Sequence, residues 1–176
     1  MKIDLSKIEG EPIRFDETIG FDADRFDPTR VIGPLKVRLE GSVRPAGDHY
    51  LVGGHTRAGG QLICGRCLEP VDWQMESNFD LEVALAESAP LDPELALEEA
   101  DLDVVYLEEP LLDLEELAIE QVVLEMPIRL LCFEECAGLC PRCGVNRNVE
   151  GACRCEPDAD PRWAALEDLA GGTPVD

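Results

Sequence analysis

The sequence predicts an α+β fold, in which an antiparallel β-sheet carries one packed helix and is followed by a C-terminal cysteine-rich module. Three observations lead to this prediction. Apolar and polar residues alternate over Val71–Leu85, as in a strand with one buried face. A segment with apolar residues at helical spacing follows at Asp113–Glu125. Six of the eight cysteines then fall between Leu131 and Asp160.

The strand predictions are clearest in the first half of the chain. Leu35–Arg44 alternates with period two, Pro45–Asp48 forms a turn, and a partner strand begins at Tyr50. Glycine pairs at 53–54 and 59–60 predict a bulge and a second turn. The less regular stretch Met1–Asp27 predicts one or two short edge strands. Val71–Leu85 is expected at the centre of the sheet with an acidic outer face, and Trp73 and Phe79 belong to its core.

The second half of the sheet domain is acidic. Glu87–Asp101 contains two prolines and many carboxylates, and predicts an irregular excursion with a short helical piece at Glu94–Ala100. Val104–Leu107 predicts a further strand. The helix has a marked start, because Asp113 can cap the backbone, Glu116 stands three residues on, and Leu112 can pack on Leu117. Pro127 ends it.

Four cysteines have the spacing of a zinc knuckle. Cys140-Pro141-Arg142-Cys143-Gly144 is a turn in which two thiolates flank a proline and a glycine frees the backbone. Cys153 and Cys155 return after a length suited to a short hairpin, which would bring four sulfurs to a tetrahedral Zn²⁺. The alternative is a set of buried or disulfide-paired cysteines.

The other four cysteines are Cys132, Cys136, Cys64 and Cys67. We interpret them as a second set of zinc ligands, without deciding which cysteines share an ion or whether one or two ions bind. Cys64-Gly65-Arg66-Cys67 lies between two predicted strands. A redox motif would need this pair at the start of a helix, where the helix dipole lowers a thiol pKa. A metal site with distant partners or a structural turn is therefore favoured. A final helix is predicted to begin at Asp160, and the chain divides into a β-rich domain at 1–128 and a zinc module at 129–176.

The formal charge of −23 is concentrated in one stretch. Residues 1–67 carry ten basic and ten acidic side chains, whereas Leu68–Ile128 carries nineteen Asp and Glu and no Lys or Arg. Such a stretch repels phosphate backbones and attracts cationic partners. A solvated acidic surface without a particular partner remains the alternative. Met1–Gly10 lacks a long apolar run, so we expect no signal peptide or membrane span and a cytoplasmic protein, where spaced cysteines more often bind metal than form disulfides.

Nothing in the sequence predicts an enzyme. An all-cysteine zinc site is closed and lacks the open position that a catalytic zinc keeps for water. The chain has no P-loop, dinucleotide-binding glycine motif or nucleophile elbow. His49 and His55 have no ligand-spaced neighbour, and we expect both on the surface. A non-enzymatic binding protein is the prediction.

Several of these motifs together resemble the YceD family. They are Cys64-Gly65-Arg66-Cys67-Leu68-Glu69-Pro70, the segment from Cys132 to Asn148, Cys153-Arg154-Cys155, and Asp160-Pro161-Arg162-Trp163-Ala164-Ala165-Leu166. The resemblance implies a cytoplasmic ribosome-biogenesis factor that is needed for accumulation of large-subunit (23S) ribosomal RNA. Some members of that family lack the C-terminal cysteines, which implies that zinc stabilises this part of the chain and is not the shared activity.

Two kinds of partner are compatible with this resemblance. The acidic stretch would bind a ribosomal protein or another basic large-subunit assembly component, with any contact to ribosomal RNA being indirect. Alternatively, the protein would bind RNA directly through scattered cations. These are Arg142, Arg147, Arg154 and Arg162 on the knuckle, or Lys36, Arg38 and Arg44 on a strand. The charge distribution favours the first kind.

Overall fold

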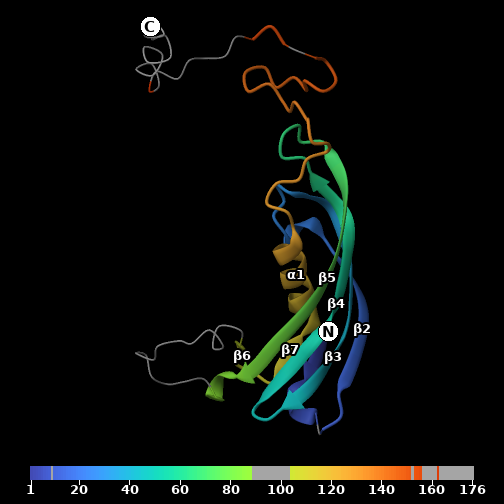
Figure 1. Cartoon of the computed structure of the whole chain (residues 1–176), viewed down its shortest axis with the longest axis vertical. Coiled ribbons are helices and arrows are strands. Elements are labelled where there is room, and N and C mark those ends of the chain that lie inside the picture. The colour runs from blue at the N-terminus through green and yellow to red at the C-terminus, as the bar shows by residue number, and fades with distance from the viewer. Residues whose placement is uncertain (9, 89–103, 152, 156–161, 163–176) are drawn as a thin grey trace, which may run out of the picture.

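The computed structural model describes residues 1–8, 10–88, 104–151, 153–155 and 162, which form a long curved sheet with one helix (Figure 1). The main sheet has the order β2 (Ile13–Phe21), β3 (Val31–Ala46), β4 (His49–Ile63), β5 (Pro70–Leu85) and β6 (Val104–Leu107). A second sheet pairs β1 (Lys2–Asp4) with β7 (Leu111–Asp113). The helix α1 (Leu114–Glu125) lies on the concave side of the main sheet. Short 3-10 turns occur at η1 (Leu5–Lys7), η2 (Ala23–Arg25) and η3 (Ala86–Ser88).

The predicted α+β class is confirmed, but the main sheet is mixed and not purely antiparallel. β6 pairs with β5 in parallel, from Glu82 opposite Val104 to Leu85 opposite Leu107. A parallel pair needs a long connection, and residues 86–103 supply one. β5 follows the predicted alternation, with Trp73, Met75, Phe79 and Val83 buried. The centre of the sheet is β4 and not β5, because β2 extends the other side over nine residues.

The glycines of β4 do not form the predicted bulge and turn. Gly53-Gly54 and Gly59-Gly60 all lie inside one continuous strand, and all but Gly60 are paired on both sides. The register irregularity beside Gly60 lies on β3, between Ile32 and Lys36. In the register of the sheet, Phe15, Gly41, Gly54 and Phe79 are adjacent across four strands. A Cβ on Gly41 would lie 2.7 Å from the ring Cζ of Phe15, and one on Gly54 would lie 2.7 Å from that of Phe79. A Cβ at either position would also overlap a backbone carbonyl oxygen of the neighbouring strand, so close strand approach and the covering rings both require glycine here.

Helix α1 begins and ends as predicted. Asp113 caps it by accepting a hydrogen bond of 2.9 Å from the Glu115 backbone N–H, and the helix ends at Glu125, before Met126 and Pro127. Burial opposes ionisation of Asp113, but the Glu115 N–H and the Lys2 ammonium outweigh it and lower the pKa of this carboxyl. The buried side of α1 packs on β3, β4 and β5 and consists of Leu114, Leu117, Ala118, Gln121 and Val122.

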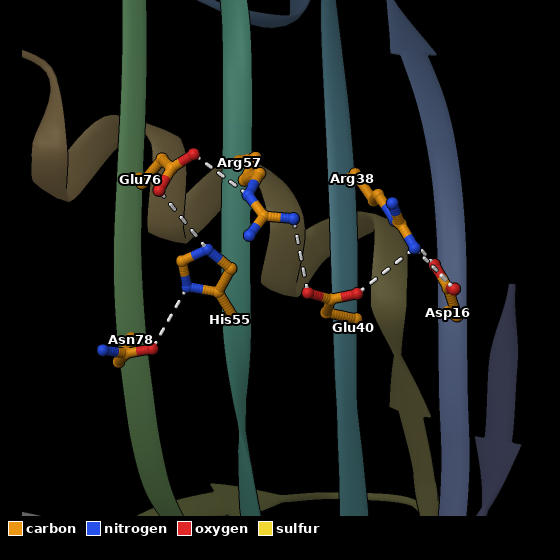
Figure 2. A network of polar contacts seen from close by, with 7 residues as sticks. All are labelled: Asp16, Arg38, Glu40, His55, Arg57, Glu76 and Asn78. Atoms are coloured by element: carbon orange, nitrogen blue, oxygen red, sulfur yellow. Dashed lines mark hydrogen bonds and ion pairs between the residues drawn. The ribbon is translucent and has the colours of Figure 1, made fainter.

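The opposite face of the sheet carries a network of charged side chains across four strands (Figure 2). Arg38 binds both carboxylate oxygens of Asp16, at 2.9 and 2.8 Å. Arg57 donates to Glu76 at 3.0 Å and lies 3.5 Å from Glu40. The outer face of β5 is acidic, as predicted. Side chains of β4 form hydrogen bonds or ion pairs with many of its polar residues. The further pairs are Gln61 with Asp72, His55 with Asn78, and His49 with Glu82.

Two predicted helical segments, Glu94–Ala100 and the helix beginning at Asp160, lie outside the described residues. Within the described part of the chain, no helix has both the length and the apolar character needed to cross a membrane.

The glycines of β4 generate a first prediction. Gly54→Ala should destabilise the protein by about 2 kcal/mol, because a Cβ there overlaps the Glu40 carbonyl oxygen and crowds the Phe79 ring. Gly59→Ala is the matched control in the same strand, since its nearest atom would be 3.5 Å away. Urea unfolding of both variants measures the difference. Equal stabilities would show that the glycines are not required by the rings.

Candidate metal centres

The first tetrad consists of Cys64, Cys67, Cys132 and Cys136. Cys64 and Cys67 flank the tight connection that follows β4 and precedes β5, whereas Cys132 and Cys136 lie in the segment after α1. Backbone hydrogen bonds hold these segments together, from Gly65 N to Leu130 O at 2.8 Å and from Leu139 N to Arg66 O at 2.9 Å. Three of the four cysteines are buried, and Cys132 is half-buried. The first tetrad therefore fixes the cysteine-rich segment to one end of the main sheet (Figure 1).

The sulfurs of the first tetrad have the spacing of ligands around one ion. Cys64 Sγ lies 3.8 Å from Cys136 Sγ, and Cys67 Sγ lies 3.5 Å from Cys132 Sγ. All four sulfurs lie within 4.8 Å of one another. Tetrahedral Zn–S bonds of about 2.3 Å put sulfurs about 3.8 Å apart, whereas a disulfide needs about 2 Å. The geometry fits a metal ion and not disulfide bonds.

Backbone N–H groups at the first tetrad favour thiolates. Burial opposes ionisation of Cys64, but the N–H groups of Cys67, Arg66 and Cys132 outweigh it and lower its pKa to about 6. Cys132 shows the opposite effect, because burial and the neighbouring thiols raise its pKa to about 12. Four adjacent thiolates repel one another, and a bound cation removes this repulsion. The site is therefore suited to a cation.

The second tetrad consists of Cys140, Cys143, Cys153 and Cys155, whose sulfurs also lie within 4.8 Å of one another. The predicted turn is present, with Gly144 N donating to Cys140 O at 2.9 Å and Gly144 at a φ of +73°. The backbone N–H groups of Cys143 and Arg142 lower the pKa of Cys140 to about 5. The Cys143 thiol and burial raise the pKa of Cys155 to about 12. Cys143 is exposed, so this tetrad is more accessible than the first.

The segment Asn146–Asn148 contacts both tetrads. Asn148 Nδ2 donates to Cys136 Sγ at 3.2 Å, and its Oδ1 accepts from Ala137 N at 2.7 Å. Arg147 interacts with the thiolates of Cys140 and Cys153, which raise the pKa of its guanidinium. From the sequence, Arg147 was considered only as an RNA-binding cation, and Asn146 and Asn148 only as parts of the family motif. No local pattern indicates these contacts, because they form only when the turn that begins at Asn146 folds back on the cysteines.

The eight cysteines thus come together in the two sets that the sequence analysis grouped. Four sulfurs this close leave room for one ion and not for a cluster with bridging sulfides. Each set offers four soft ligands and no open position for a substrate or water, which is typical of a site that stabilises structure. Two tetrads that could each hold a metal ion are the main chemical feature of the described residues.

Fold and site define an α+β protein with a curved, one-helix sheet and a cysteine-rich segment fixed to its end. A family model described as large ribosomal RNA subunit accumulation protein YceD matches residues 52–170, and the chain belongs to this family. Membership supports a role in ribosome biogenesis.

The chain is also similar to mycobacterial proteins. It is 35% identical over 135 residues to uncharacterised proteins of Mycobacterium bovis and Mycobacterium tuberculosis, covering 76% of this chain and 61% of theirs. An uncharacterised protein of Mycobacterium leprae is 30% identical over 134 residues, which is 76% of this chain and 58% of that protein. The chain thus spans about three fifths of the length of these relatives. No solved structure matches.

The exposure of the tetrads generates a second prediction. Cys64→Ser and Cys143→Ser should each reduce bound metal by about one equivalent, because each removes one of four ligands. Cys64→Ser should also lower the unfolding temperature clearly, since its tetrad joins the sheet to the later segment, whereas Cys143→Ser should leave unfolding of the sheet nearly unchanged. Elemental analysis and calorimetry measure both effects. Wild-type protein with intact disulfides and less than about half an equivalent of metal would contradict the assignment.

A third prediction concerns Asn148. Asn148→Asp keeps the acceptor for Ala137 but replaces the donor to Cys136 with a carboxylate beside a thiolate. We expect metal affinity at the first tetrad to fall about 10- to 100-fold. Chelator competition in a Cys143→Ser background would isolate this tetrad. Asn146→Asp is the control, because it keeps the oxygen that accepts from Asn148 N and loses only a donor to Glu69, which is not one of the cysteine ligands. If the two variants bound metal with equal affinity, Asn148 would make no contribution to the first tetrad.

Proposed function

We propose that this protein is a non-enzymatic ribosome-biogenesis factor that binds a basic component of the assembling large subunit. Family membership supports a role in ribosome biogenesis. The charge distribution is the reason for proposing a basic protein as the partner. Nineteen carboxylates without one Lys or Arg between Leu68 and Ile128 are expected to attract cationic proteins and to repel RNA. Ribosomal proteins are cationic, and RNA of higher charge density would displace the factor from them.

We further propose that both tetrads bind Zn²⁺ and that the metal has a structural role. Four thiolates in tetrahedral spacing and the absence of an open ligand position support this choice. In this proposal residues 1–128 form the binding domain, and residues 129–176 form a zinc module that Cys64 and Cys67 join to it. The cysteine-only ligand sets also support a protein without catalytic activity, because a zinc ion bound by four thiolates is a poor Lewis acid.

A binding experiment tests the choice of partner. Purified protein should bind basic large-subunit ribosomal proteins, and the affinity should fall steeply with added salt. Neutralising Glu94, Glu98, Glu99 and Asp101 together should weaken binding while circular dichroism and metal content stay unchanged. Binding isotherms at several salt concentrations measure the effect, with 23S ribosomal RNA as the competing ligand.

Direct RNA binding is the alternative that this experiment separates. The matched variant replaces Arg142, Arg147 and Arg154 with glutamine, with metal content measured as a control, because Arg147 contacts thiolates. If this variant loses RNA binding and the acid-neutralised variant binds ribosomal proteins normally, the protein is an RNA-binding protein and the acidic stretch is only solvated surface.

A further inference from the structure

The solvent-facing side of α1 and the residues after it are unusually apolar for a surface. Val123 and Leu124 are 54% and 77% exposed, and Ile128 is 97% exposed. A helix on the surface of a sheet normally has polar residues on its outer side. Here three large apolar side chains within six residues of the chain face solvent. Concentrated apolar exposure of this kind marks an interaction surface more often than scattered single residues do.

Carboxylates border this apolar cluster on one side. Glu116 and Glu120 precede Leu124 by two and one helical turns, so all three share one side of α1. Both glutamates are exposed, and neither has an ion-pair partner among the described residues. This differs from the outer face of the sheet, where cations of β3 and β4 pair with the acids. The charges of Glu116 and Glu120 are thus available to a partner, whereas Glu115 pairs with the N-terminal amine.

Cations lie on the other side of the cluster. Ile128 borders a hollow of about 450 Å³ whose lining also includes Leu68, Leu130, Arg30 and Arg129. The surface therefore runs from carboxylates through apolar side chains to arginines. A partner segment would orient with its cations toward Glu116 and its apolar residues on Leu124 and Ile128.

We propose that the α1 surface, defined as Glu116, Glu120, Val123, Leu124 and Ile128, binds a basic segment of a partner protein that carries apolar side chains. The inference rests on the proposed function and assigns its contact surface. Charge selects this occupant over a second copy of the chain, because two chains that each carry a formal charge of −23 repel each other. The apolar side chains supply short-range affinity, and the carboxylates increase the rate of encounter.

Two synthetic peptides test the surface directly. They have equal length and equal positive charge, but one combines lysine with leucine and the other combines lysine with serine. The lysine–leucine peptide should bind wild-type protein at least about tenfold more tightly. Leu124→Ser/Ile128→Ser should remove that preference, and Glu116→Gln/Glu120→Gln should weaken both peptides and reduce the salt dependence.

Matched variants control for composition and net charge. Val149→Ser removes an apolar side chain that is 80% exposed outside this surface, and Glu108→Gln/Glu109→Gln removes the same charge from exposed positions after β6. Both should bind the lysine–leucine peptide within about twofold of wild type. Equal losses in the control and α1 variants would overturn the inference, as would a glutamate–leucine peptide that binds equally well.

Sedimentation equilibrium tests the competing occupant. A wild-type dimer that Leu124→Ser/Ile128→Ser converts to a monomer would show that the α1 surface binds a second copy, and the inference would be wrong. Measuring how wild type and the α1 variants bind basic ribosomal proteins distinguishes failure of this inference from failure of the proposed function. If wild-type protein binds no basic ribosomal protein, the proposed function fails. If it does bind and the α1 variants bind equally well, only this inference fails.

Discussion

The cysteine-rich segment depends on the first tetrad for its position. Between Leu130 and Cys155 the described residues contain no helix or strand, apart from one bridge between Leu139 and Asn146. A segment with so little regular structure and so few apolar side chains cannot form a core of its own. Four sulfurs contributed by two distant parts of the chain replace that core. Gly138 fits this arrangement, because a Cβ there would lie 2.8 Å from the Arg66 carbonyl oxygen.

The negative charge of the chain is distributed unequally over the structure. On the outer face of β5, the acids at 72, 76 and 82 contact Gln61, Arg57 and His49 of β4, so each has a polar partner within the sheet. Exposed pairs of this kind each contribute little stability. They do reduce the negative electrostatic potential that a partner would meet at this face. On helix α1, Glu115 pairs with the N-terminal amine at 3.0 Å, but Glu116 and Glu120 have no such partner among the described residues. The acidic stretch is therefore two surfaces with different electrostatic properties, although its sequence is uniformly acidic.

Local signals in the sequence predicted the strands, the helix and the grouping of the cysteines. Alternation fixes which face of β5 is buried, Asp113 and Pro127 define the helix ends, and cysteine spacing indicates shared ligands. The errors concern relations between distant segments. Gly54 was interpreted as part of a bulge, whereas in the structure it lies beside Phe79 within a continuous strand. No residue of β6 indicates that this strand pairs in parallel. Asn148 was missed as a contact of Cys136 for the same reason.

The first tetrad and the α1 surface are connected through a short stretch of backbone. Arg30 donates to the carbonyl of Pro127, and Gly65 holds the carbonyl of Leu130 at 2.8 Å. Ile128 lies between these two fixed points, which explains how an isoleucine that is almost fully exposed keeps a defined position. Gly65 itself sits between the two cysteines that follow β4. A metal ion that ordered the first tetrad would thus also order Ile128, whereas Leu124 is held by the helix alone. The proposed metal site and the proposed contact surface would in this way be parts of one structural arrangement.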